Sequence, residues 1–321
     1  MIAVNKFNMN TSSAANYFSA AICAMYIYFF FDLAYYDQGL NPDILNYHLD
    51  FVSERWSFDI GFEIYQSFLR DYLYLNFQQF WLTTVIIICA LYFFISNKAC
   101  QLPFFIINYL FIANVLGTQV RFFLGGILFL VALNINKKQI KHAILLLVCT
   151  LHYGLLILYI LYLLTLWLLN RYSLTHMVKY KYFIILAAII SYFLSKSIVI
   201  FILPYTRFSY YLGSLYLEGK SLISFLYAAM QLITIIMFAS SYKYKLEKNS
   251  RDRILVSYNL LILLFIISTS SVAVLSGRYL LIDIIMESLI ASVLIRYNIA
   301  FFTLYFMISF TKVLPLILDY V

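Results

Sequence analysis

The stretch AILLLVCTLHYGLLILYILYLLTLWLL at residues 143–169 decides the fold, because its 27 residues fit neither one membrane helix nor two. One perpendicular helix needs about 20 residues to cross the hydrocarbon core, and two complete spans need about twice that number. His152 and Gly154 interrupt the apolar run near its middle. We therefore expect a re-entrant pair of helices broken near His152–Gly154, with a single long tilted helix as the alternative.

Composition places the rest of the chain in the membrane as well. Hydrophobic residues make up 64% of the 321 residues and charged residues only 11%, which is too much apolar surface for a soluble core of this length. At about 20 residues for each span, little remains for a separate soluble domain. The expected fold is an all-α polytopic membrane protein, a single membrane domain over 1–321 with about 9–11 transmembrane or re-entrant helices.

The apolar runs locate the expected spans and the charged loops orient them. Spans are expected at 17–36, 80–96, 182–203, 221–240, 254–275, 279–295 and 298–318, with a short hairpin of 104–117 and 122–133 that has Arg121 at its tip. Basic residues gather in 136–142, 170–181 and 241–253, which the positive-inside rule places in the cytoplasm. The net charge of +8 therefore reflects topology and does not indicate nucleic-acid binding. The polar segment 37–79 holds seven of the 14 acidic residues and is expected as an outer, periplasmic loop.

A few ionisable residues interrupt or flank the apolar stretches, and this topology brings four of them toward the outer side: Arg121, His152, Arg207 and Arg278. Charge at bilayer depth is rarely kept without a use. The arginines suit a diphosphate group, because a planar guanidinium donates several hydrogen bonds in a fixed fork and stays charged. His152 is a candidate base for activating a sugar hydroxyl, with Asp43 and Asp59 as rivals.

Structural roles stay open for the same residues. Arg121 and Arg278 are also placed to reach lipid headgroups from helix ends. Asp283 and Glu287 share one helical face, and Asp283 is an alternative ion-pair partner for Arg278. Most of the remaining outer-loop carboxylates are interpreted as a solvated face: Asp37, Asp50, Glu54 and Asp71.

The order of these landmarks resembles the EpsG-like branch of the Wzy polysaccharide polymerases. Asp43 with Tyr47 in PDILNY resembles that family's Asp-x-x-x-Tyr element. Asp59, Gly61 and Phe62 in FDIGFEIY resemble its Glu-x-Gly-Phe element. Asp59 stands where the family has Glu, so Glu63, one helical turn further on, is an alternative for the role of this carboxylate.

Three later landmarks extend the resemblance over nearly the whole chain. Arg121 in VRFFLGGILFLVAL resembles the Arg that opens a short helix in that family. His152 in LHYGLLILYILYLL resembles the family's His followed by Tyr or Ser, and Arg278 in SGRYLL resembles a late Arg near an outer helix end.

The resemblance implies a GT-C-like fold and a glycosyltransferase that polymerises undecaprenyl-diphosphate-linked oligosaccharide repeat units into O-antigen or a related surface polysaccharide. The implied reaction is an inverting transfer that needs no metal or cofactor, on the periplasmic face of the bacterial inner membrane. Its partners are a lipid-linked donor, a lipid-linked acceptor and membrane lipid, with a chain-length regulator as a further candidate. An O-antigen ligase-like glycosyltransferase and a lipid-linked oligosaccharide flippase are the alternatives.

Each candidate residue has an expected role in this reaction. His152, Asp59 or Asp43 would accept the proton of the attacking hydroxyl. The charge on the departing diphosphate would be stabilised by Arg121, Arg278 and Arg207. The expected sugar contacts are Tyr47, Trp56, Phe62, Glu63 and Tyr153.

Overall fold

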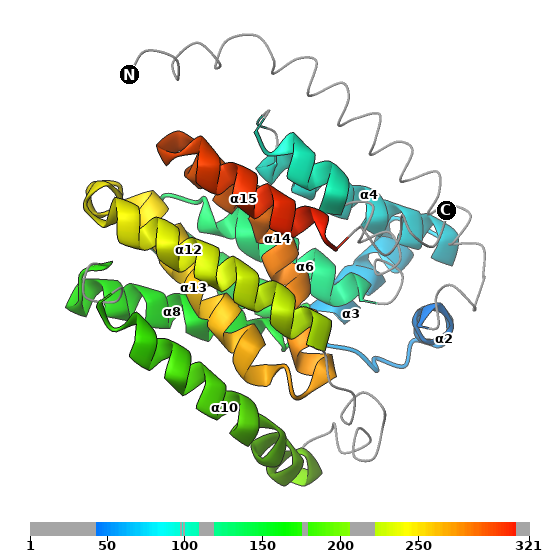
Figure 1. Cartoon of the computed structure of the whole chain (residues 1–321). Helices are drawn as coiled ribbons and strands as arrows, with labels where there is room; N and C mark the ends of the chain where they lie inside the picture. Colours follow the sequence, from blue (N-terminus) through cyan, green and yellow to red (C-terminus); the bar gives the residue numbers. More distant parts are fainter. Residues whose placement is uncertain are drawn as a thin grey trace, which may run out of the picture. The chain divides into compact units, whose positions relative to one another are not determined.

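The computed structural model describes residues 43–96, 98, 100–108, 119–174, 179–205 and 222–312, and these residues form helices and no strand (Figure 1). Four helices in this part of the chain are long and apolar enough to cross a membrane: Phe77–Ile95, Ile185–Tyr205, Phe225–Lys248 and Ser250–Thr269. The expected all-α membrane protein is therefore confirmed at this level. The span expected at 17–36 lies outside the described residues.

The described residues divide into two compact units. The first contains the residues up to Tyr159 together with Lys312, and the second contains Ile160–Thr311. The boundary falls inside helix α8 (Leu155–Arg171). That the chain forms a single membrane domain stays a prediction.

The first unit packs short helices against one long apolar helix. Its elements are α2 (Ile44–Ser53), α3 (Ile60–Ser67), the π-helix η1 (Phe68–Tyr72), α4 (Phe77–Ile95), α6 (Val120–Leu133) and α7 (Lys138–Cys149). A capping box begins α4, in which Asn76 and Gln79 each accept the backbone N–H of the other. α4 packs on α6, and α6 packs on α7. Phe80 and Trp81 of α4 are almost completely buried in the resulting core.

The chain breaks between α7 and α8, where the apolar run at 143–169 is interrupted. α7 ends at Cys149 and α8 begins at Leu155, with His152 in the turn between them. The Nδ1 atom of His142 in α7 lies 3.1 Å from the Tyr159 hydroxyl in α8, so the chain doubles back at this turn. A single long tilted helix is therefore excluded. The re-entrant placement of the pair in a membrane stays a prediction.

Two glycines allow close approaches within the first unit. A Cβ atom on Gly125 of α6 would lie 2.3 Å from Cδ1 of Leu155. A Cβ atom on Gly61 of α3 would lie 2.1 Å from Oγ1 of Thr150 and 2.7 Å from its carbonyl carbon. The Gly61 N–H donates to the Thr150 carbonyl at 2.9 Å. This contact ties the start of α3 to the turn that carries His152.

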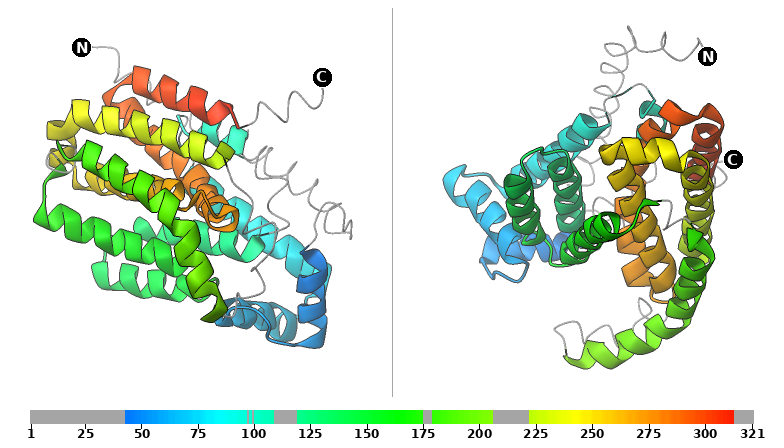
Figure 2. Two further views of the ribbon diagram at one scale, coloured as in Figure 1. Left: turned by 60° about the horizontal axis from the view of Figure 1, so that its bottom comes forward. Right: turned by 90° about the vertical axis from the view of Figure 1, so that its left-hand side faces the viewer.

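The second unit is organised around a four-helix bundle. Its helices are α10 (Lys181–Ile202), α12 (Leu222–Lys248), α13 (Ser250–Thr269), α14 (Ala273–Tyr297) and α15 (Ile299–Phe310). α12 to α15, yellow to red in Figure 2, form the bundle, because each packs on the next and α15 also packs on α12. α10 packs against α13. The side chains of Asn249 and Asn298 cap α13 and α15, so very short connections suffice between these helices.

These helices correspond to the spans expected between residues 182 and 318, with shifted ends. α13 begins at Ser250 and ends at Thr269, where 254–275 is expected. α14 begins at Ala273, where 279 is expected. Residues 313–318 of the last expected span lie outside the described residues.

Replacing Gly61 with alanine should destabilise the protein, because the new methyl group meets the backbone of Thr150. Overpacking of this kind costs about 1–3 kcal/mol, so the melting temperature of the purified protein in detergent should fall. Gly277→Ala in α14 is the matched control, since nothing lies within 4 Å of a Cβ atom there and alanine favours a helix. Equal melting temperatures for the two variants would contradict the close contact.

Candidate active site

Arg121 lies in the first turn of α6 and binds residues of α2 and of the turn before α3. Its Nη1 atom donates to Oδ2 of Asp59 at 2.8 Å, and its Nε atom donates to the Tyr47 hydroxyl at 3.2 Å. The guanidinium carbon lies 4.1 Å from the centre of the Phe58 ring. The Asp59 side chain is 2% exposed and the Arg121 side chain 20%. The carboxylate is therefore removed from water, while part of the arginine remains accessible to a ligand.

His152 lies beside this arginine site. The ring of Phe122, the residue after Arg121, meets the His152 ring edge to face at 5.1 Å between centres. Nδ1 of His152 accepts the Gly154 N–H at 3.0 Å. A neutral imidazole that accepts at Nδ1 carries its proton on Nε2. A neutral His152 in this arrangement can donate only through Nε2, and uptake of a proton at Nδ1 requires release of the Gly154 contact.

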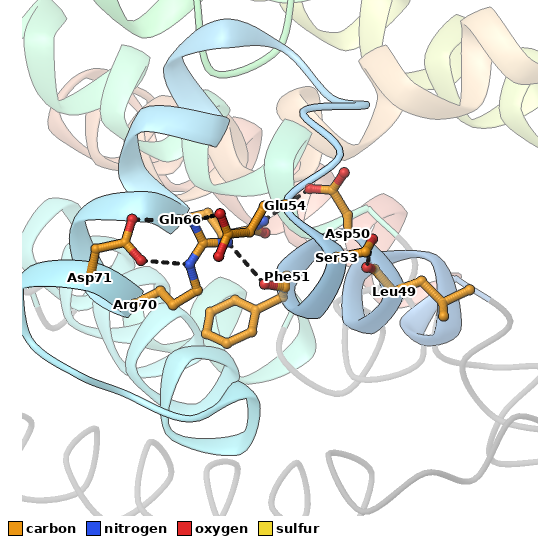
Figure 3. Close-up of polar contacts among 8 residues, drawn as sticks. All are labelled: Leu49, Asp50, Phe51, Ser53, Glu54, Gln66, Arg70 and Asp71. Carbon is orange, nitrogen blue, oxygen red and sulfur yellow. Dashed lines mark hydrogen bonds and ion pairs between the residues drawn. The ribbon is translucent and has the colours of Figure 1, made fainter.

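A buried carboxylate in α2 holds the turn that leads to Asp59. Oδ1 of Asp50 accepts the Ser57 N–H at 3.0 Å and also the Ser57 hydroxyl. Oδ2 of Asp50 accepts from Nε2 of Gln66 at 2.9 Å, so α2 and α3 are joined through this residue (Figure 3). Asp50 is 2% exposed. Its interpretation as part of a solvated face is wrong, because the side chain is buried and its hydrogen bonds come from within the protein.

Glu63 fixes the same turn from the other side. Its Oε1 atom accepts the Phe58 N–H at 2.6 Å, and its side chain also bonds to Asp50. Burial raises the pKa of Glu63 to about 6 against the opposing Phe58 hydrogen bond, and the charge of Asp50 adds to the rise. Burial opposes ionisation of Asp50 too, but the bonds from Ser57 and Gln66 outweigh it and hold that pKa below its usual range.

Folding stability should fall as the pH rises from about 4.5 to about 6, because folded Glu63 keeps its proton in this range and the unfolded chain does not. A shift of this size corresponds to about 2 kcal/mol. Glu63→Gln should remove the slope, since an amide still accepts from Phe58 and donates to Asp50 without a charge. Melting temperatures of both proteins between about pH 4.5 and about pH 7.5 test this. A slope that persists in the variant would assign it to another group.

Two other outer-loop carboxylates are exposed, as the sequence predicts. The side chain of Glu54 is 64% exposed and that of Asp71 48%. Both pair with Arg70, which also donates to the carbonyl of Phe51 at 2.9 Å (Figure 3). Asp37 lies outside the described residues.

The expected sugar contacts separate into exposed and buried residues. Trp56 is 53% exposed and Tyr153 is 47% exposed, so both offer surface to a ligand. Tyr47, Phe62 and Glu63 are at most 3% exposed. These three shape the site from within the protein and present no face on which a sugar ring could stack.

Three further predicted residues are Asp43, whose negative charge acts on Arg121, and the arginines Arg278 and Arg207. Asp43 is the N-cap residue of α2, one turn before Tyr47. Arg278 belongs to α14 in the second unit, and Arg207 lies outside the described residues. The convergence of three arginines on one diphosphate therefore stays a prediction.

Two carboxylates of α14 are fully buried in the second unit. Asp283 accepts a hydrogen bond from Asn259 at 2.7 Å. Glu287 accepts from Gln231 at 2.8 Å, and from two hydroxyl groups that belong to Tyr227 and Ser309. Uncharged donors from α12, α13 and α15 therefore join these helices to α14, a packing role that the sequence does not indicate.

The described site combines a largely shielded cation, buried carboxylates and a neighbouring imidazole. An arginine held by Asp59 and Tyr47 is fixed in orientation, so its accessible edge can bind an anionic oxygen without reorganisation. Comparison of the chain with protein-family models, curated proteins and solved structures gave no match. The functional argument therefore rests on these residues and on their contacts.

Proposed function

We propose that this protein is a membrane glycosyltransferase that polymerises undecaprenyl-diphosphate-linked oligosaccharide repeat units on the periplasmic face of the bacterial inner membrane. In the first unit Arg121 contacts Asp59 and Tyr47 and lies beside the turn that carries His152. This observation supports the proposal most directly. Tyr47 and Arg121 are 74 positions apart in the chain. A lone arginine that reached for headgroups from a helix end would not need a carboxylate, a hydroxyl and an aromatic ring to fix it.

In the proposed reaction the acceptor hydroxyl oxygen attacks the anomeric carbon of the donor sugar. The bond from that carbon to the diphosphate oxygen breaks, and undecaprenyl diphosphate leaves with the electron pair. Arg121 donates hydrogen bonds to the departing diphosphate, where negative charge builds in the transition state. One direct displacement inverts the anomeric configuration. Arg278 and Arg207 would add charge at the same diphosphate in a GT-C-like arrangement of the whole chain.

Two parts of the site would serve the acceptor side. Asp59 and Asp43 are carboxylates that can take the proton from the attacking hydroxyl. His152 favours hydrogen-bond donation through Nε2, because Gly154 occupies Nδ1; it becomes a base only after this contact opens. Trp56 and Tyr153, with their exposed rings, would cover the sugars.

Deletion of the gene in its native host tests the proposal at the level of the cell. The deletion should leave a single-repeat band in place of the surface glycan ladder, and a plasmid copy should restore the ladder. An unchanged ladder in the deletion would exclude polymerisation. Complete loss of surface glycan would indicate a flippase or a ligase instead.

A matched pair of variants distinguishes a loss of the Arg121 site from a general disturbance of the hairpin formed by α7 and α8. His142→Ala should restore the ladder, because His142 lies in the same hairpin and contacts Tyr159 away from Arg121. Arg121→Lys should not restore it, since a lysine keeps the charge and loses the fork that reaches Asp59 and Tyr47 together.

A further inference from the structure

Helix α3 exposes apolar side chains and buries polar ones, which is the reverse of a helix that faces water. Ile60, Ile64 and Phe68 recur every four residues along α3 and the start of η1, and they are 49%, 57% and 51% exposed. On the opposite face the polar side chains of Glu63 and Gln66 are buried, with exposed fractions of only 2% and 1%. A helix that faces water buries its apolar residues and exposes its polar ones. This segment therefore has an outer face suited to apolar surroundings.

The π-helix η1 extends the apolar face by one turn. In an α-helix every fourth side chain drifts by about 40° around the axis. The wider π-turn at Phe68–Tyr72 reduces this drift. The rings of Phe68 and Tyr72 are accordingly stacked, with centres 5.7 Å apart. Tyr72 is 74% exposed and continues the row that begins at Ile60.

Helix α2 repeats the reversed pattern independently. Leu45, Leu49 and Val52 lie at helical spacing on its surface and are 43%, 43% and 64% exposed. The carboxylate of Asp50 faces inward and is 2% exposed. Two neighbouring helices of the segment predicted as a solvated loop thus expose apolar side chains and bury their charges.

The exposed apolar face lies close in the chain to the start of the membrane-spanning helix α4, and this position favours membrane lipid as its surroundings. η1 ends at Tyr72, and the membrane-spanning helix α4 begins at Phe77. The connection carries two more exposed apolar residues, Leu73 at 51% and Tyr74 at 86%. So short a connection keeps η1 at the level where α4 enters the bilayer. The ion-paired side chains of Arg70, Asp71 and Glu54 supply charged groups of the kind that face headgroups and water.

We infer that α2, α3 and η1 form an interfacial membrane-binding surface, whose exposed face of Leu45, Leu49, Val52, Ile60, Ile64, Phe68 and Tyr72 inserts among the acyl chains of the bilayer leaflet next to the start of α4. The ligand is the bilayer itself, not a protein partner. Since Asp59 directly precedes Ile60, this placement sets the Arg121 site at the headgroup level, where the diphosphate of a lipid-linked sugar lies.

Spin-label accessibility in liposomes tests this inference without any assay of activity. Single cysteines are placed at Leu49, Ile64 and Phe68, in a full-length variant whose four native cysteines are replaced. Asn46 and Arg55, which are exposed outside the apolar face, receive the control labels. The protein is reconstituted in phosphatidylcholine and phosphatidylglycerol without polyprenyl lipid. A high collision rate with oxygen shows that the label lies among acyl chains, and a high collision rate with a water-soluble nickel complex shows that it lies in water.

The three labels on the apolar face should collide several-fold more with oxygen than with the nickel complex, and the control labels should show the reverse. Nickel accessibility at Ile64 and Phe68 equal to that at Arg55 would overturn the inference. Shielding that arises only after undecaprenyl phosphate is added would overturn it as well, because the face would then bind the polyprenyl chain and not the bilayer. Melting temperatures of the labelled proteins confirm that each remains folded.

Discussion

Arg121→Met should strongly reduce polymerisation and destabilise the fold, whereas the double variant Arg121→Met with Asp59→Asn should recover the fold without recovering the activity. The single change leaves the Asp59 carboxylate buried with its arginine removed, which costs about 3–5 kcal/mol. The second change replaces that charge by a neutral amide of similar shape and should restore most of the melting temperature. Loss of the cation at the departing diphosphate should lower the rate by a factor of about 100–1,000 in both variants.

This pair of variants distinguishes a catalytic arginine from a structural ion pair. If Arg121 and Asp59 form only a structural ion pair and neither takes part in the reaction, the double variant should polymerise as well as it folds. Polymerisation that returns together with the melting temperature would therefore remove Arg121 from the reaction. Asp59→Asn alone is the control, because it keeps the cation and measures how much activity is lost with this candidate base; the double variant should be slower than this control.

His152→Ala should reduce turnover by a factor of about 100–10,000, the range expected for a lost proton-transfer or hydrogen-bonding group. His152→Gln separates the two roles. Glutamine retains an N–H donor but cannot take up a proton near neutral pH. Because Gly154 occupies Nδ1 of His152, we expect the glutamine variant to keep measurably more activity than the alanine variant.

Initial rates of chain growth for purified wild type, His152→Ala and His152→Gln test this expectation. Equal loss in both variants would assign His152 to proton transfer and would leave Asp59 and Asp43 with supporting roles. Full activity of His152→Ala would place the chemistry elsewhere in the site. His142→Ala serves as the control for any change to the hairpin.

The features that local sequence determines were predictable. The apolar run at 143–169 is too long for one span and is interrupted by His152 and Gly154, so the break between α7 and α8 follows from the pattern. Arg121 at the start of α6 follows from the charge that precedes a short apolar run. Asp59 and His152 were identified as candidates because each stands out chemically from its neighbours.

The contacts that assemble the site were not predictable from one sequence. The Asp59–Arg121 pair joins residues 62 positions apart, and nothing in the local pattern specifies that distance. The inward position of Asp50 had one available signal: Asp43, Tyr47 and Asp50 recur at the spacing of a helical stripe. Tyr47 is a predicted site residue, and Asp50 shares its helical stripe, so this spacing favours an inward position for Asp50.

The exposed apolar side chains of α2 and α3 do not follow from the sequence reading, because that reading equates an acidic segment with a solvated loop. The segment carries many acidic residues, but three of them, Asp50, Asp59 and Glu63, are buried. The apolar residues between them take the outside. A count of charges therefore does not show which side chains of this segment lie on its surface.

The measurement that tests the proposed function most directly is release of undecaprenyl diphosphate by the purified protein in liposomes that contain lipid-linked repeat units. The wild-type protein should release it in step with the growth of an oligosaccharide ladder, while the folded Arg121→Met, Asp59→Asn double variant should release it about 100–1,000 times more slowly. Release by both proteins at the same rate, or by neither, would contradict the assignment of polymerisation to the Arg121 site.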